Sequence, residues 1–306
     1  AAWLAAAASA ALLTACGGGD LAVPGSVGTA GAPTTKGSFT SVVSFGDSLS
    51  DVGAYAPATS LAGTGAAPYF GGKFTTNSST ATVWVENVAT SMGLVITPHE
   101  VGFAGASVKC PAAAVPALAN SCTGYGQGGA RVTDPAGVGK SGGALTVPVK
   151  TQIANHLSRF TSFKSSDLIL VWAGNNDIFT QFAVFGATAT QVQTDAATGK
   201  ITADQASNLL LNAQLTAQGA MKQAAQELAG YVRSEILAKG GKYVVVMTLP
   251  DIGDTPFGGT LTASARPVLT SLSETFNLWL RDGLAGARQR NITIQRHDPR
   301  HGRGAP

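Results

Sequence analysis

The sequence predicts an α/β fold in which helices cover both faces of a parallel sheet. Three short runs rich in Val, Ile and Leu have the length and composition of buried strands. They cover Ser41–Phe45, Asp167–Ala173 and Lys242–Leu249. Because strands that alternate with helical segments form parallel sheets through right-handed crossovers, the pattern indicates a single α/β domain.

The remaining elements follow in chain order. Apolar residues at helical spacing predict helices over Thr82–Leu94, Val149–Phe160, Thr202–Lys239 and Ala263–Arg290. The third of these ends at Gly240-Gly241, a typical stop signal, and Asn291–Gln295 is a short last strand. Between Thr97 and Val147 the chain is Gly-rich and irregular, and long insertions of this kind often carry function.

The composition excludes several classes of protein. The chain has 306 residues, of which 44% are hydrophobic and only 12% charged, so it can bury a sizeable core and is not disordered. The formal net charge is +3, and no predicted helix carries a basic stripe. We therefore expect no nucleic-acid partner.

The N-terminus has the pattern of an export signal. Trp3–Leu13 is an Ala/Leu run that is too short to span a bilayer and has the apolar centre of a secretory signal. It leads into Leu-Thr-Ala-Cys, which resembles a bacterial lipobox and implies a lipid on Cys16. We expect a signal segment over residues 1–15, a flexible tether over 16–37, and an exported lipoprotein anchored on the periplasmic or outer-membrane side. A plain signal peptide with an incidental cysteine is the alternative.

The other two cysteines form an even pair. With Cys16 set aside, Cys110 and Cys122 remain in a chain bound for an oxidising compartment, which predicts a disulfide between them. A disulfide that closes a loop of this length stabilises the folded state by about 3 kcal/mol in the chain-entropy treatment. Two isolated cysteines without paired histidines do not make a metal-ligand set, so we expect no metal and no cofactor.

Ser48 stands out because it follows the first predicted strand directly. Gly46 permits a tight turn there, and Leu49-Ser50-Asp51 could begin a helix. A serine at the carboxyl end of an early strand has its hydroxyl at the crevice where open α/β sheets bind ligands. The alternative is an ordinary strand-to-helix turn, for which Asp-Ser is a common pair.

The amino-acid sequences of five segments resemble the conserved blocks of one protein family. Phe45-Gly46-Asp47-Ser48-Leu49-Ser50-Asp51 is similar to the first block of the GDSL (SGNH) lipases and esterases. The later segments that resemble family blocks, in the family's order, are Phe74–Gly93, Tyr125–Arg131, Gly174–Asp177 and Leu249–Pro256. The resemblance implies a flavodoxin-like, three-layer SGNH hydrolase fold over residues 38–295 and a serine esterase or lipase that acts on ester or lipid substrates.

The resemblance also implies roles for three residues. Ser48 would be the nucleophile that forms an acyl-enzyme, and the oxyanion donors would be the N–H groups of Ser48 and Gly129 and the side-chain amide of Asn176. Gly129 has no Cβ, so its N–H can approach a substrate oxygen closely. Asn176 follows the second predicted strand and should lie at the same sheet edge as Ser48, although a turn residue would fit there too.

The catalytic base departs from the family pattern. The family's Asp-x-x-His block is matched in spacing by Asp298 and His301, but Gly302–Pro306 cannot support the helix expected after it. We interpret residues 296–306 as an atypical tail and expect the chain as given to be C-terminally truncated and inactive. The alternative function is therefore an impaired remnant that binds ester-like ligands. His99 should be a loop residue, and His156 an exposed helix residue.

A third hypothesis rests on the Gly-rich run around Lys140. Gly139-Lys140-Ser141-Gly142-Gly143 fits the G-x-S-x-G elbow of α/β-hydrolases, and the overlapping run Gly137-Val138-Gly139-Lys140-Ser141 resembles a Walker A loop. No strand is predicted before the run and no helix directly after it, and Asp134 occupies the position of the first Walker glycine. Nucleotide hydrolysis is therefore the weakest of the three functions.

Overall fold

A computed structural model describes residues 39–56, 73, 81–290 and 292–295. Its centre is a four-stranded sheet in the order β1-β4-β5-β6, and every pair of neighbours is parallel. The strands are β1 Ser41–Gly46, β4 Asp167–Trp172, β5 Tyr243–Met247 and β6 Ile292–Gln295. All four lie within a residue or two of the predicted runs. The predicted signal segment, tether and tail (1–15, 16–37 and 296–306) lie outside the described residues, as do residues 74–80 of the second family segment.

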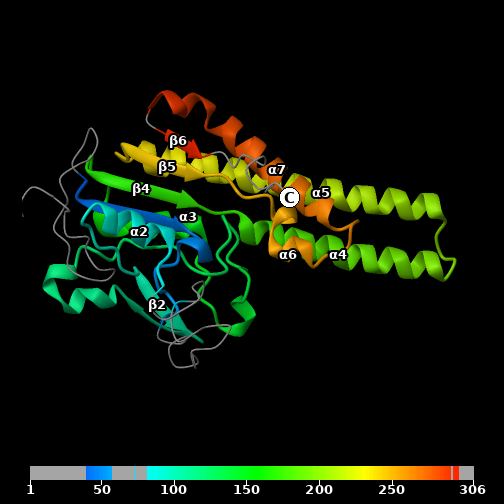
Figure 1. The fold of residues 1–306 in the computed structure, drawn as a ribbon, viewed down its shortest axis with the longest axis horizontal. Helices are drawn as coiled ribbons and strands as arrows, with labels where there is room; N and C mark the ends of the chain where they lie inside the picture. Colours follow the sequence, from blue (N-terminus) through cyan, green and yellow to red (C-terminus); the bar gives the residue numbers. More distant parts are fainter. Residues whose placement is uncertain (1–38, 57–72, 74–80, 291, 296–306) are drawn as a thin grey trace, which may run out of the picture.

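Helices connect the strands, as predicted from the alternating pattern (Figure 1). The main ones are α2 Trp84–Ser91, α3 Val149–Phe160, α4 Asn175–Ala197, α5 Ala203–Tyr231 and α7 Arg266–Gly283. α5 continues through a π-helical turn, Val232–Leu237, and α7 is followed by a 3-10 turn, Ala285–Arg290. A short helix, α6 Pro256–Gly259, precedes α7.

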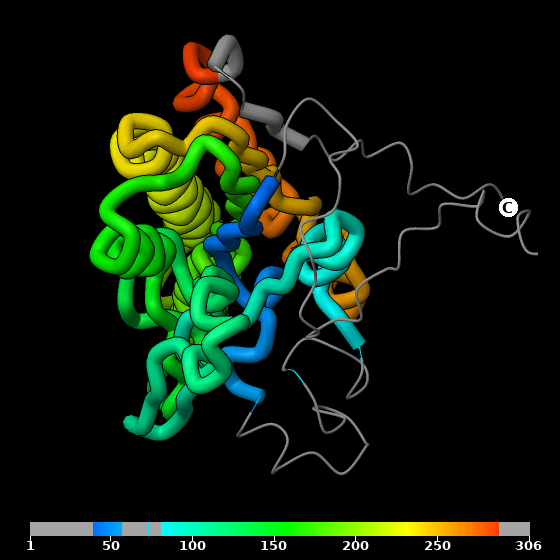
Figure 2. The backbone as a smooth tube through the Cα atoms, turned by 90° about the vertical axis from the view of Figure 1, so that its left-hand side faces the viewer, coloured from blue at the N-terminus to red at the C-terminus, as the bar shows by residue number. Residues whose placement is uncertain are grey.

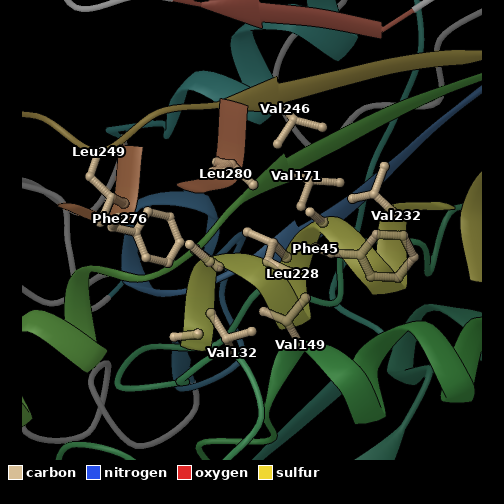
Figure 3. Packing of buried hydrophobic residues seen from close by; sticks show 14 of the residues in the cluster. Phe45, Val132, Val149, Val171, Leu228, Val232, Val246, Leu249, Phe276 and Leu280 are labelled. Carbon is tan, nitrogen blue, oxygen red and sulfur yellow. The ribbon is translucent and has the colours of Figure 1, made fainter. Parts of the chain in front are cut away.

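Alternate side chains of β1 enter two separate cores, which makes the molecule three-layered. Val43 and Phe45 are buried in a large core with residues of α3, α5 and α7 (Figure 3). Val42 points the other way, into a smaller core with Val85 and Ala89 of α2. Figure 2 shows α2 on the opposite side of β1 from α5. The predicted α/β fold with helices on both faces is therefore confirmed.

Helix α4 is the main element that the sequence did not predict. It contains Gly186 and several threonines, which have weak helix propensity, so its local signal is poor. Thr188 and Thr190 donate their hydroxyls to the carbonyls of Val184 and Gly186, four residues back. Tertiary packing stabilises the helix instead, because Ile178 is buried in the large core together with Met221 of α5. The α4–α5 hairpin extends well beyond the sheet (Figure 1).

The Gly-rich insertion is ordered by a hairpin, a disulfide and the edge of the sheet. Strands β2 (Glu100–Phe103) and β3 (Ala106–Lys109) form an antiparallel hairpin that the sequence did not predict. Cys110 and Cys122 are joined, with their Cα atoms 5.4 Å apart, so the predicted disulfide is present. Beyond it, an isolated parallel bridge between Ser44 and Gly124 attaches the insertion to the free side of β1. The insertion thus lies alongside β1, close to the C-terminal end of this strand.

Candidate active site

Ser48 and Asn176 lie at one edge of the sheet because they follow neighbouring parallel strands. β1 and β4 end in register, with Gly46 opposite Trp172. Ser48 opens a 3-10 turn, Ser48–Ser50, whose N-cap Asp47 accepts a hydrogen bond from the N–H of Leu49 at 3.1 Å. Asn176 lies in the first turn of α4. The expectation that both residues share this edge is therefore confirmed.

The turn after β1 is held by close backbone contact. A Cβ on Gly46 would lie 2.2 Å from the carbonyl oxygen of Trp172, so only glycine allows β1 to approach β4 there. The buried amide of Gln152 on α3 satisfies both backbone groups of Gly46, accepting from its N–H at 2.9 Å and donating to its carbonyl at 2.8 Å. The backbone of Gly46, which directly precedes Asp47 and Ser48, is thus held in place by Gln152.

Asp51 connects the turn to the family segment Tyr125–Arg131. Its carboxylate, 2% exposed, accepts hydrogen bonds from the N–H groups of Gly53 at 2.8 Å, Ala54 at 2.6 Å and Gly128 at 2.9 Å. Burial raises the pKa of this carboxyl, against the lowering effect of the three N–H donors. Asp51 therefore holds the residue before Gly129 against the turn that contains Ser48.

Gly129 occupies a position that no other residue could take. Its φ is +80°, in the left-handed region, and a Cβ would lie 1.9 Å from the carbonyl oxygen of Val138. The N–H of Val138 in turn donates to the carbonyl of Gly129 at 2.9 Å. The structure thus requires glycine here because of backbone geometry and crowding, while the prediction that its N–H approaches a substrate oxygen stays a prediction.

The family segment Gly174–Asp177 is hydrogen-bonded to the segments that contain Ser48 and Gly129. Asn176 donates its side-chain amide to the carbonyl of Ala130 at 2.9 Å. Asp177 accepts from the N–H of Val132 and from Nε of Arg131, both at 3.0 Å. Asn175 donates to the carboxylate of Asp47 at 3.0 Å. The segments that contain Ser48, Gly129 and Asn176 are thus linked pairwise by buried hydrogen bonds.

Asp47, the neighbour of Ser48, is fully buried. Burial raises the pKa of its carboxyl to about 6, while the amide of Asn175 and the N–H of Leu49 favour the ionised form. Sequence reasoning assigned no catalytic or supporting role to Asp47, Asp51 or Asn175, although all three lie inside the family segments. No local sequence pattern predicts the contact of Gln152 with Gly46, because the two residues are 106 positions apart.

Both described histidines belong to a buried aromatic cluster. His156 was expected to be exposed, which is wrong: it is 2% exposed, and its ring stacks on Phe163 with centroids 4.3 Å apart. It lines a cavity of about 160 Å³ with Ser41 and Asp167, at the edge where β1 and β4 begin, opposite Ser48. His99 does lie in a loop, but it is buried, with its ring centroid 4.4 Å from that of Tyr125.

The run around Lys140 does not have the structure of either motif it resembles. Lys140–Gly142 is a single 3-10 turn, and Nζ of Lys140 donates to the carbonyl of Leu145 at 3.0 Å. In the described part of the chain no strand leads directly into this turn and no helix follows before α3. The context required for a phosphate loop or a nucleophile elbow is missing.

Two broader features concern metals and membranes. Among residues 39–56, 73, 81–290 and 292–295, no three His, Cys, Asp or Glu side chains gather closely enough to hold a metal ion. Within the same ranges, no helix combines the length and the hydropathy needed to cross a bilayer.

Comparison with protein families agrees with the site. The family model for GDSL-like lipase/acylhydrolase matches residues 42–304, a range that contains Ser48, Gly129 and Asn176 and also includes Asp298 and His301. No curated protein matches the chain significantly. The parallel sheet with helices on both faces is the α/β arrangement of an SGNH hydrolase. The match covers well over half of the 306 residues, so the chain belongs to the GDSL-like lipase/acylhydrolase family.

Proposed function

We propose that this protein hydrolyses carboxylic esters, as an esterase or lipase, through an acyl-enzyme on Ser48. The observation that carries the proposal is the buried hydrogen-bond network at the carboxyl edge of the sheet. Asp51 holds Gly128, Asn175 holds Asp47, and Asn176 holds Ala130, which brings the nucleophile and the oxyanion donors together. Preorganised donors of this kind are usually the largest contribution to catalysis of acyl transfer.

The proposed reaction has two steps. Ser48 Oγ attacks the ester carbonyl carbon while a base takes its proton, and the carbonyl oxygen becomes an oxyanion. The N–H groups of Ser48 and Gly129 and the amide of Asn176 donate to this oxyanion. Asn176 uses one amide hydrogen for Ala130, and its NH₂ group has a second one for the oxyanion. The alcohol leaves with the proton, and water then hydrolyses the acyl-enzyme.

We infer that the base is one of the two histidines among residues 296–306. The chain has four histidines, and His99 and His156 lie in the aromatic cluster, with His156 at the opposite sheet edge. His297 and His301 remain. β6 is parallel to β1, so Gln295 ends at the edge where Ser48 lies, three strand spacings or about 14 Å along the sheet. Six residues further on, His301 has a reach of up to about 20 Å. Because this reach exceeds the distance along the sheet to Ser48, the proposal favours His301 as the base, with Asp298 to orient it, over the inactive remnant.

The test is turnover of a p-nitrophenyl ester by the 306-residue chain and by its Ser48→Ala variant. We expect the wild type to release p-nitrophenol and the variant to lose this activity while keeping its thermal unfolding midpoint. If the wild type is inactive but binds a non-hydrolysable ester analogue, the remnant hypothesis is correct instead. If the variant is as active as the wild type, Ser48 is not the nucleophile.

A second proposal concerns location. We infer from the lipobox-like run that a bacterium exports this protein and attaches lipid to Cys16, so that it acts from the membrane surface. Growth with a clickable fatty acid should label the wild type but not Cys16→Ser. Equal labelling of the two proteins, or no labelling of either in a host that lipidates a control lipoprotein, would contradict the anchor.

A further inference from the structure

The hydroxyl of Tyr55 contacts the peptide that joins Gly128 and Gly129. Tyr55 lies seven residues after Ser48 and is 3% exposed. Its hydroxyl donates to the carbonyl oxygen of Gly128 at 2.9 Å and accepts from the N–H of Thr146 at 3.1 Å. The buried phenol hydroxyl thus lies between two backbone groups, one of which belongs to the family segment Tyr125–Arg131.

That carbonyl shares a rigid unit with the proposed oxyanion donor. A peptide group is planar, and in the trans form its C=O and N–H point in opposite directions. The hydrogen bond to the oxygen of Gly128 therefore also fixes the direction of the N–H of Gly129. A peptide between two glycines needs such an anchor more than any other, since neither neighbour has a side chain to restrict its rotation.

The two adjoining peptides have their own anchors. On one side the N–H of Gly128 is held by Asp51 at 2.9 Å, and on the other the carbonyl of Gly129 accepts from Val138 at 2.9 Å. The peptide between them is held by Tyr55. Donation to a carbonyl also polarises the amide, which makes its N–H a stronger donor.

We infer that Tyr55 is a positioning residue for ester hydrolysis, whose hydroxyl aims the N–H of Gly129 at the oxyanion. The inference rests on the proposed function, because it gives Gly129 the role of oxyanion donor. Burial raises the pKa of the Tyr55 hydroxyl above its ordinary value, so the group stays protonated and able to donate throughout the pH range of an esterase assay.

The kinetic test is Tyr55→Phe, which keeps the ring and removes only the hydroxyl. Loss of a whole oxyanion donor costs about 10²–10³ in kcat, so a misaimed donor should lower kcat about 10- to 100-fold. KM should not change, because the oxyanion forms only after binding. Inhibition by a boronic acid, whose serine adduct is tetrahedral and negatively charged, should weaken by the same factor as kcat/KM.

Tyr231→Phe is the matched control. It removes the same atom from a hydroxyl that lies 3.0 Å from Thr133 Oγ1, on α5 and outside the network around Ser48. We expect its kcat, KM and boronate affinity to equal those of the wild type. Tyr55→Met, which fills similar space without a hydroxyl, should show the loss seen in Tyr55→Phe and replaces that variant if it does not fold.

A second readout does not need catalysis. In a Ser48→Ala background with ¹⁵N-labelled glycine, adding Tyr55→Phe should shift the amide resonance of Gly129, whereas adding Tyr231→Phe should not. This separates failure of the inference from failure of the proposed function, which would leave the wild type inactive. An unchanged kcat, a loss confined to KM, an unmoved Gly129 resonance, or unfolding of both Tyr55 variants while Tyr231→Phe stays folded would overturn the inference.

Discussion

Replacing His156 by phenylalanine should make the protein more resistant to acid. The His156 ring is buried among Phe45, Tyr125, Phe160 and Phe163, and within the part of the chain that the structure describes neither ring nitrogen has a hydrogen-bond partner. Burial, with a smaller contribution from the charges of Arg159, His99 and Lys164, lowers the pKa of His156 to about 4. A phenylalanine fits an aromatic cluster without a group that must be protonated when the chain unfolds.

The size of the effect follows from proton linkage. The folded state releases its proton at about pH 4 and the unfolded state at 6.5, so stability falls as the pH drops below 6.5 and levels off near 4. At pH 5 the unfolded state is favoured by about 2 kcal/mol through this one histidine, and at pH 7.5 by less than about 0.1 kcal/mol. His99 has a pKa lowered to about 4 as well, mainly by burial, and adds a loss of the same sign.

The assay is urea unfolding of the wild type and His156→Phe at pH 7.5 and pH 5.0. Between these two values the wild type should lose about 2 kcal/mol more than the variant. Comparison of the two proteins cancels the contributions of the buried carboxyls, which both share. Ser158→Ala, an exposed change on the same helix, should keep the wild-type pH dependence. Equal losses in wild type and His156→Phe would refute the argument that an unpartnered, neutral histidine is buried here.

Two further predictions concern backbone and covalent constraints. Gly129→Ala should abolish ester hydrolysis and lower the unfolding midpoint, because its Cβ would lie 1.9 Å from the carbonyl oxygen of Val138 at a φ of +80°; a variant with normal kcat and midpoint would contradict this. The Cys110→Ser/Cys122→Ser double variant should lose about 3 kcal/mol of unfolding free energy in urea. A loss below about 0.5 kcal/mol would show that the disulfide does not constrain the unfolded chain as the entropy treatment requires.

The parts of the fold that the sequence predicted are those with a strong local signal. β1, β4 and β5 are short apolar runs, and α3 spans the predicted range, Val149–Phe160. Topology predicted that Ser48 and Asn176 meet at one edge, because they follow neighbouring parallel strands, whereas their roles and that of Gly129 came from the resemblance to the family. α4 was missed because its threonines and Gly186 weaken the local helix signal, and its packing against α5 is a tertiary effect.

The supporting residues of the site were beyond sequence reasoning for a physical reason. Tyr55 and Gly128 are 73 residues apart, and Gln152 and Gly46 are 106 apart. Such contacts depend on how the insertion folds back on β1, which periodicity does not reveal. His156 illustrates the opposite error: a polar residue on a helix is usually exposed, but here the ring packs as an aromatic side chain.

The most direct test of the central claim is covalent labelling of the nucleophile. A p-nitrophenyl phosphonate transfers its phosphonyl group to an activated serine and releases p-nitrophenol, which leaves a stable adduct for mass spectrometry. We predict a single adduct on the peptide that contains Ser48, lost in Ser48→Ala and in His301→Ala but retained in His297→Ala. An adduct on another serine, or none on the wild type, would contradict the claim that Ser48 is an activated nucleophile; unaltered labelling of His301→Ala would remove His301 as its base.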